Sequence, residues 1–325
     1  MKAAVLSKFG LENLRIEEMD EPKQKHGFIR IKTKFAGINP LEYNVIAGKV
    51  LYGVSPMPHI PGSEIFGESM DNGNLIKKGD RVIIYNRDYD GKCNLCISGK
   101  EYLCPNGGLW GVMSNGGYSE IISVREENVF KVPDTVSDYV ATSLPIDAIT
   151  AYHALKEANS KPGESLLVYG ASGNTGLFSL QLGRIFGMKV TAISRNDFVK
   201  EFGADEIFSM ENIPLELEAD VIINPLGGEI LSGSLSHLRR RGRLVSFGVL
   251  TGVKGVIDIG KLYTRELRII GSTGGSRMDL IELLSIADKE NLRVQVDKIF
   301  PLSDIKSALN YFSGKRKGRV LLSFQ

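Results

Sequence analysis

The sequence has no long apolar run, no large excess of charge of either sign, and few cysteines or histidines: three and four, respectively, in 325 residues. No stretch approaches the ~18 to 20 apolar residues that a membrane-spanning helix needs. The first residues, MKAAVLSKFGLENLRIEE, carry acids and bases throughout. They have the pattern of neither a signal peptide nor a transit peptide, so we expect a cytoplasmic protein.

The charge balance argues against two classes of partner. The formal net charge is +2 at pH 7, which gives no electrostatic reason to expect a nucleic acid or an anionic membrane. We expect the two basic runs to be solvated surface or neighbours of a cofactor phosphate; they comprise Arg239, Arg240, Arg241 and Arg243, and Lys315, Arg316, Lys317 and Arg319.

The composition is that of a globular protein, with 42% hydrophobic and 24% charged residues, and the length suits two domains. Residues 1–146 alternate short apolar and polar runs, punctuated by glycine and proline, which predicts a partly closed β domain. From residue 147 onward strand-like and helix-like segments alternate, as expected for βαβ units on a parallel sheet. The closing segment, 300–324, is predicted to return to the first domain.

A glycine-rich turn between a predicted strand and a predicted helix is the strongest single motif. In SLLVYGASGNTGLFSLQLGRIFG, Gly170 and Gly173 permit a tight turn and a close approach to a pyrophosphate. Gly176 lets the helix pack near the strand, whereas Ala171 departs from the usual glycine pattern. An ordinary tight turn is the alternative. The predicted dinucleotide contacts are Gly170, Ala171, Ser172, Gly173, Asn174, Thr175 and Gly176.

The end of the next predicted strand, KVTAIS, indicates which dinucleotide binds. Sites for NAD place an acidic residue there to accept hydrogen bonds from the ribose 2′-hydroxyl. This chain has Ser194 and Arg195 instead, which suit a 2′-phosphate, and Asp197 comes too late for that role. We predict NADP(H), with Arg195 as an ordinary surface residue being the alternative.

Three cysteines lie within twelve residues, in DYDGKCNLCISGKEYLC. The spacing of Cys93, Cys96 and Cys104 is typical of thiolates that converge on one tetrahedral ion, and Asp90 is the only suitable fourth ligand nearby. We predict one structural zinc ion per chain. Metal-free reduced cysteines and a redox pair remain alternatives.

With these motifs, the whole chain resembles the medium-chain dehydrogenase/reductase superfamily of zinc-containing alcohol dehydrogenases and quinone oxidoreductases. The resemblance rests on segments such as AGINPLEY, PGSEIFGE, GKCNLCISGKEYLC, GASGNTG, INPLGG and GRLVSFG. It implies an α/β fold with a GroES-like β-barrel domain (1–146 and 273–325) and a Rossmann doubly wound domain (147–272). It also implies a structural-zinc lobe at about residues 86–108, in which Asp90 replaces a cysteine, and a homodimer or homotetramer.

The resemblance also shows where this chain departs from an alcohol dehydrogenase. The family's catalytic zinc ligands fall at Asn39, Ser63 and Ile146 (or Asp147), and its proton-relay hydroxyl falls at Leu41. None of the first three is a good zinc ligand. We therefore expect no catalytic zinc.

Without that metal, the simpler chemistry is hydride delivery from NADPH to a small molecule such as an enone, a quinone or another carbonyl compound. The resemblance to zinc-free quinone oxidoreductases places Asn39 near the nicotinamide and Tyr43 as a donor to the substrate oxygen. Tyr43 as a packed aromatic is an equal alternative, and Glu64 is expected to hold an arginine or backbone partner. Two other functions stay open: an alcohol dehydrogenase with atypical ligands such as Glu64 and Asp147, and a non-catalytic NADPH-binding protein.

Further cofactor contacts are implied by the resemblance at strand ends along the expected crevice. They are Thr150, Pro225, Leu226, Phe247, Gly248, Val249, Ser272 and Thr273.

Overall fold

The computed structural model describes residues 1–50 and 53–324, and the chain divides into two compact units. The first unit comprises residues 1–146 and 276–325, and the second comprises residues 147–275. The second unit runs to Gly275, which packs against Ile149 and His153, whereas its end was expected at residue 272. No helix among the described residues is long and apolar enough to cross a bilayer.

The first unit is built on one mixed sheet with strand order β16-β17-β3-β4-β5-β9, and β8 pairs with β3. Short apolar runs between turns supply its inward-facing side chains, such as Ile29 and Ile31 of β3. The sheet strands are β3 Phe28–Gly37, β4 Ile65–Ser69, β5 Arg81–Ile84, β8 Ile121–Arg125, β9 Val129–Lys131, β16 Val296–Pro301 and β17 Arg319–Ser323. Strand β17 pairs antiparallel with β3, so the C-terminal segment completes this sheet, as the sequence predicted.

The remaining elements of the first unit flank that sheet. Two small antiparallel pairs are β1 Lys2–Leu6 with β2 Leu14–Glu18, and β6 Arg87–Asp88 with β7 Gly108–Leu109. The helices are α1 Pro40–Ile46, α2 Asn94–Ile97, α3 Asp138–Ser143, α8 Arg277–Lys289 and α9 Ile305–Ser313. Helix α9 buries Ile305, Ala308, Leu309 and Phe312, whose spacing gives it one apolar face.

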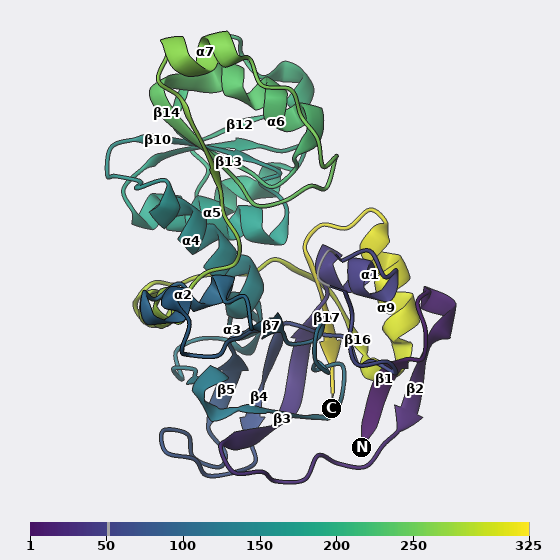
Figure 1. Cartoon of the computed structure of the whole chain (residues 1–325). Coiled ribbons are helices and arrows are strands. Elements are labelled where there is room, and N and C mark those ends of the chain that lie inside the picture. The colour runs from purple at the N-terminus through teal and green to yellow at the C-terminus, as the bar shows by residue number, and fades with distance from the viewer. Residues whose placement is uncertain (51–52, 325) are drawn as a thin grey trace. The chain divides into compact units, whose positions relative to one another are not determined.

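The second unit is a parallel sheet with strand order β12-β11-β10-β13-β14-β15. Its strands are β10 Ser165–Tyr169, β11 Lys189–Ile193, β12 Glu206–Phe208, β13 Ala219–Asn224, β14 Leu238–Ser246 and β15 Arg268–Gly271. Within this unit, helices α4 Ile149–Glu157 and α5 Asn174–Ile185 cover one face, while α6 Gly228–Ser234 and α7 Ile259–Thr264 cover the other (Figure 1). This is the doubly wound arrangement that the sequence predicted.

Two details of the second unit differ from the sequence reading. Strand β12 lies in EIF, a run too short to stand out from its surroundings. The helical segment that includes α6 ends at His237, so Arg239, Arg240 and Arg241 belong to β14. The register between β13 and β14 shifts there: β13 advances from Ala219 to Val221 while β14 advances from Leu238 to Arg243. Strand β14 therefore bulges at its amino end.

Candidate functional site

The glycine-rich turn joins β10 to α5 and has a geometry that only glycine tolerates at two positions. Gly170 has φ +62°, in the left-handed region. The amide of Gly173 donates to the Gly170 carbonyl at 2.9 Å, and Gly173 caps α5. A Cβ at Gly176 would lie 2.5 Å from the Gly170 oxygen, so a side chain there would push the helix off the turn. The start of α5 is thereby held close to the end of β10.

The loops after β13 and β14 converge on this turn. A Cβ at Gly170 would meet Pro225 and Leu226 at 3.4 Å, and one at Gly248 would overlap the backbone of Pro225. The side chain of Asn224 fixes the loop after β13, because its Oδ1 accepts hydrogen bonds from the amide of Leu226 at 2.9 Å and from the next amide at 3.1 Å. Asn224 was missed from sequence, although an Asx turn at a strand end is a local signal.

Most of the predicted cofactor contacts follow the carboxyl ends of neighbouring parallel strands. Ser194 follows β11, Pro225 follows β13, Phe247 follows β14, and Ser272 and Thr273 follow β15. The Ser272 amide donates to the Ser246 carbonyl at 2.9 Å, which extends the pairing of β14 with β15 to this edge. In open parallel sheets this edge is where dinucleotides bind.

Thr150 and Val249 are placed differently. Thr150 lies in the first turn of α4, after a π turn that carries the buried Asp147. Asp147 accepts a hydrogen bond from the hydroxyl of Thr175 at 3.3 Å, so this turn adjoins the start of α5. Val249 is 58% exposed.

The end of β11 carries a hydroxyl and a guanidinium rather than a carboxylate. Ser194 is half-buried, and its Oγ accepts a hydrogen bond from the Asn196 amide at 2.9 Å. The Arg195 side chain is exposed. The pKa of Glu211 is held below its usual range by hydrogen bonds to its carboxylate from the Glu211 backbone and from Ser209, and by the charge of Arg195. The segment after β12 thus contributes a carboxylate whose charge interacts with that of Arg195.

The cysteine cluster has the dimensions of a tetrahedral metal site. The Sγ atom of Cys93 lies 3.5 Å from that of Cys96 and 3.8 Å from that of Cys104. Four ligands about 2.3 Å from a zinc ion would be separated by about 3.8 Å. One oxygen of Asp90 joins these sulfurs, with all ligand atoms within 4.8 Å of one another. The donor set of three thiols and one carboxylate therefore fits zinc.

Asp90 is held in place by the surrounding backbone and by Asn106. Its Oδ2 accepts a hydrogen bond from Asn106 Nδ2 at 2.6 Å, and its Oδ1 accepts from the amides of Lys92 and Cys93 at 2.8 and 3.0 Å. These hydrogen bonds, with that of Asn106 the largest contribution, hold the pKa of Asp90 well below its usual range. A carboxylate kept ionised and oriented in this way is suited to bind a cation. Asn106 was not identified from sequence.

Asn39 caps α1 and belongs to a buried polar network in the first unit. Its Nδ2 donates to Glu64 Oε2 at 2.8 Å, and Glu64 pairs with Arg319. All three residues are buried to 97% or more. A Cβ at Gly37 would overlap this ion pair, so β3 needs glycine there. The expectation that Glu64 holds an arginine is confirmed.

Glu42 supports the same network from the opposite side and was missed from sequence. Its Oε2 accepts from the Asn39 amide at 2.9 Å and its Oε1 from the Ser63 amide at 3.1 Å. The side chain is fully buried, and this burial raises the pKa of Glu42. One carboxylate therefore ties together the two backbone positions at which the family carries zinc ligands.

Tyr43 lies one turn after Asn39 on α1. Its ring stacks on Phe312 of α9, with centroids 5.7 Å apart and planes at 25°. Burial raises the pKa of its hydroxyl. The ring thus packs in the apolar cluster formed by α1, α9 and β17.

A catalytic metal does not fit the residues around Asn39. Ser63 is fully buried, and Glu42 and Glu64 are engaged by amides and by Arg319. In residues 1–50 and 53–324, the Asp90 cluster is the one group of three or more histidine, cysteine or acidic side chains whose ligand atoms converge.

Two family models match the chain. Residues 25–134 match the alcohol dehydrogenase GroES-like domain, and residues 175–289 match the zinc-binding dehydrogenase domain. Together these matches span parts of both units.

Known proteins resemble the chain over nearly its full length. An NAD-dependent alcohol dehydrogenase of Sulfolobus acidocaldarius is 30% identical, with 99% of each chain covered. An acryloyl-coenzyme A reductase of Metallosphaera sedula is 27% identical, covering 99% of this chain and all of the relative. The structure of a cobalt- and zinc-bound thermostable alcohol dehydrogenase from Pyrobaculum aerophilum superimposes with a TM-score of 0.93, at 35% identity, over all of this chain and 99% of that one.

Proposed function

The chain belongs to the medium-chain dehydrogenase/reductase superfamily as an alcohol dehydrogenase-like oxidoreductase, and on that premise we propose that it reduces activated alkenes or quinones with NADPH and without a catalytic zinc. The observation that carries the proposal is the environment of Asn39. Where the family places a thiolate ligand, this chain has an amide that donates to Glu64, and Glu64 is paired with Arg319. The buried charges there compensate each other without a metal ion.

The reaction needs little from the protein beyond positioning and hydrogen bonding. When bound, NADPH supplies a hydride to the β-carbon of an enone, and the π electrons move to the carbonyl oxygen. Asn39 orients the reacting groups, while the hydroxyl of Tyr43 donates a hydrogen bond to the oxygen on which charge develops. A proton taken up from water would then add to the α-carbon, which would give the saturated ketone and NADP⁺. The name of the Metallosphaera relative, a reductase of an α,β-unsaturated thioester, supports this substrate class.

Turnover with different acceptors tests this proposal. NADPH oxidation is measured with a quinone, an enone and acryloyl-coenzyme A, and reduction of NADP⁺ is measured with simple alcohols. We expect oxidation with at least one acceptor in protein that holds about one zinc ion. Two zinc ions per chain, with alcohol-dependent reduction only, would establish the alcohol dehydrogenase alternative. Cofactor binding without turnover of any acceptor would support the non-catalytic alternative.

We propose NADPH rather than NADH because the end of β11 bears Ser194 and Arg195. The Sulfolobus relative is named as NAD-dependent, so cofactor choice is a property to test in this chain itself. Replacing Arg195→Asp removes a cation and adds a carboxylate that repels a 2′-phosphate. We expect the ratio of kcat/KM for NADPH to that for NADH to fall by about 10- to 150-fold, since a charge-assisted pair contributes about 1.5–3 kcal/mol. A ratio unchanged in this variant, with Lys200→Asp as a control of equal charge, would contradict the assignment.

We also propose that Asp90, Cys93, Cys96 and Cys104 hold a structural zinc ion. The convergence of three sulfurs and one oriented carboxylate supports this assignment. Bound there, zinc would cross-link the lobe and leave no position open for substrate.

Self-association as a homodimer or homotetramer is part of the proposal. Apolar side chains after β14, including Val253, Val256 and Ile259, are 78%, 82% and 62% exposed. An apolar surface of this kind is typical of a contact between protein chains. Light scattering that gives the mass of one chain at micromolar concentration would contradict self-association.

A further inference from the structure

A cavity lies in the second unit, at the amino-terminal edge of the parallel sheet. Its volume is about 770 Å³. It adjoins the starts of β13 and β15, whereas the glycine-rich turn follows the carboxyl end of β10. Five cations line the cavity, Lys161, Arg240, Arg241, Arg243 and Arg268, against three acids, Glu164, Asp220 and Glu266. The basic run of β14 therefore lies at the sheet edge opposite the predicted cofactor turn, and a role beside the cofactor phosphates does not account for it.

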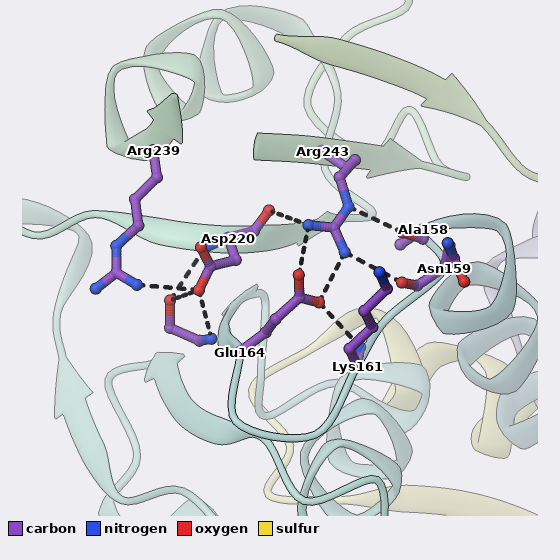
Figure 2. A network of polar contacts seen from close by, with 8 residues as sticks. Ala158, Asn159, Lys161, Glu164, Asp220, Arg239 and Arg243 are labelled. Atoms are coloured by element: carbon purple, nitrogen blue, oxygen red, sulfur yellow. Dashed lines mark hydrogen bonds and ion pairs between the residues drawn. The ribbon is translucent and has the colours of Figure 1, made fainter. Parts of the chain in front are cut away.

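The acids on one wall are already engaged by arginines (Figure 2). Arg243 donates to both oxygens of Glu164, at 3.0 and 2.7 Å, and to the Ala158 carbonyl at 2.9 Å. Asp220 accepts from Arg239 at 3.0 Å. On this wall the charges of Glu164 and Asp220 are therefore neutralised by Arg243 and Arg239.

The other arginines are held only loosely. Arg241 approaches Glu266 at 3.4 Å, and their side chains are 79% and 74% exposed. Arg240 reaches a single carbonyl, that of Thr264, at 3.4 Å. Among the described residues, the side chain of the exposed Arg268 forms no hydrogen bond or ion pair. Three guanidinium groups thus face one cavity with little local compensation.

The backbone around the cavity is unusual as well. In the described part of the chain, the non-glycine residues with positive φ are Asn159, Arg241 and Glu266, with φ of 49°, 63° and 50°. All three line this cavity. Arg241 lies in the bulge of β14, and its backbone amide donates a hydrogen bond to the Arg265 carbonyl at 2.7 Å. Left-handed residues, and bulges that redirect side chains, concentrate at functional sites. Position 241 carries an arginine although a glycine there would strain the backbone less.

We propose that this cavity, here called the arginine cavity, binds a nucleoside polyphosphate at a site separate from the dinucleotide turn. Arg240, Arg241 and Arg268 bind the phosphates, for which planar guanidinium groups are the preferred partners. The ring of Tyr263, which lines the cavity and is 72% exposed, stacks with the base. The proposal stands independently of the reaction that the enzyme catalyses.

Calorimetric titration with tripolyphosphate and with ATP tests the assignment on the full chain, in the presence of saturating NADPH. We expect one site per chain for both probes, with binding that weakens as salt rises. Arg241→Gly removes one guanidinium and relieves the left-handed backbone. It should weaken both probes at least tenfold while the melting temperature stays equal or rises. Asn159→Gly is the matched control, because it relieves the backbone on the same cavity without removing charge, and it should bind as the wild type does.

The remaining arms identify the ligand. Tyr263→Ala should weaken ATP but not tripolyphosphate. The proposal would be overturned if wild type and Arg241→Gly bound tripolyphosphate with equal affinity. It would also be overturned if tripolyphosphate did not bind at ~1 mM. An oligonucleotide that binds more tightly than ATP, with a steep salt dependence, would overturn the assignment to a small molecule.

Discussion

Removing the metal from the Asp90 cluster is the perturbation whose size the structure defines best. The proposed zinc closes a loop from Asp90 to Cys104, which is about 15 residues long. A cross-link over such a loop stabilises a protein by about 3 kcal/mol, mainly by restricting the unfolded chain. For a unit of this size, each kcal/mol shifts the melting temperature by about 2–4 °C. Stripping the ion should therefore lower the melting temperature by roughly 6–12 °C.

Replacing Asp90→Ala leaves three thiolates to hold the ion. Altering groups outside the ligand shell already weakens metal binding about 10–100-fold, so loss of a ligand should speed zinc release to a chelator at least tenfold. Asp90→Cys should slow release, because a fourth thiolate replaces the carboxylate. Release is followed with a colorimetric chelator, and zinc per chain is measured by elemental analysis.

The metal-free proteins separate metal binding from local hydrogen bonding. Asp90→Ala also loses the contacts to Asn106 and to two amides, and this loss is present with or without zinc. The difference in melting temperature between wild type and variant should therefore be larger with zinc than without it. Wild-type protein purified under reducing conditions with no bound zinc, or with a melting temperature indifferent to chelator, would refute the reasoning.

Two further perturbations test the buried network and a third tests Tyr43. Arg319→Met should lower the free energy of unfolding, measured in urea, by about 3–5 kcal/mol, because it leaves Glu64 buried without its partner. A double variant that also carries Glu64→Gln should recover part of this stability. No recovery in the double variant would contradict the pairing of Glu64 with Arg319. Burial raises the folded-state pKa of Glu42, so its contribution to stability is present below the unfolded pKa of about 4.3 and is lost as pH rises through the folded value. The Glu42→Gln variant should lack this dependence of the unfolding free energy on pH. Parallel profiles of unfolding free energy against pH for wild type and variant would contradict this expectation. Tyr43→Phe should lower kcat for the accepted substrate by about 100-fold or more if the hydroxyl donates a proton or hydrogen bond to the substrate, whereas unchanged kcat with unchanged melting temperature would leave the ring a packing role only.

Local patterns in the sequence were sufficient for much of this description. The βαβ alternation, the glycine-rich turn and the return of the C-terminal strand to the first sheet are all present as predicted. Gly170 and Gly176 could be identified because a tight strand-to-helix turn depends on residues close together in the chain. The family matches then confirmed the superfamily and the fold class.

Errors arose where short segments lacked a periodic signal. Strand β12 has three residues, and the first part of β14 contains three consecutive arginines whose polarity hides a strand. The second unit extends to Gly275, which packs against α4.

The sequence by itself determined the alternation of strands and helices in the second unit, the turn at Gly170 and the spacing of the cysteines, because each depends on residues that the chain already holds near one another. Only the tertiary structure paired Glu64 with Arg319, which are 255 positions apart, and placed Glu42 between the amides of Asn39 and Ser63. It also gathered three left-handed residues and a set of arginines around one cavity. Such partners are selected by the packing of distant segments, where a buried charge must meet its counter-charge, and no spacing along the sequence encodes that choice.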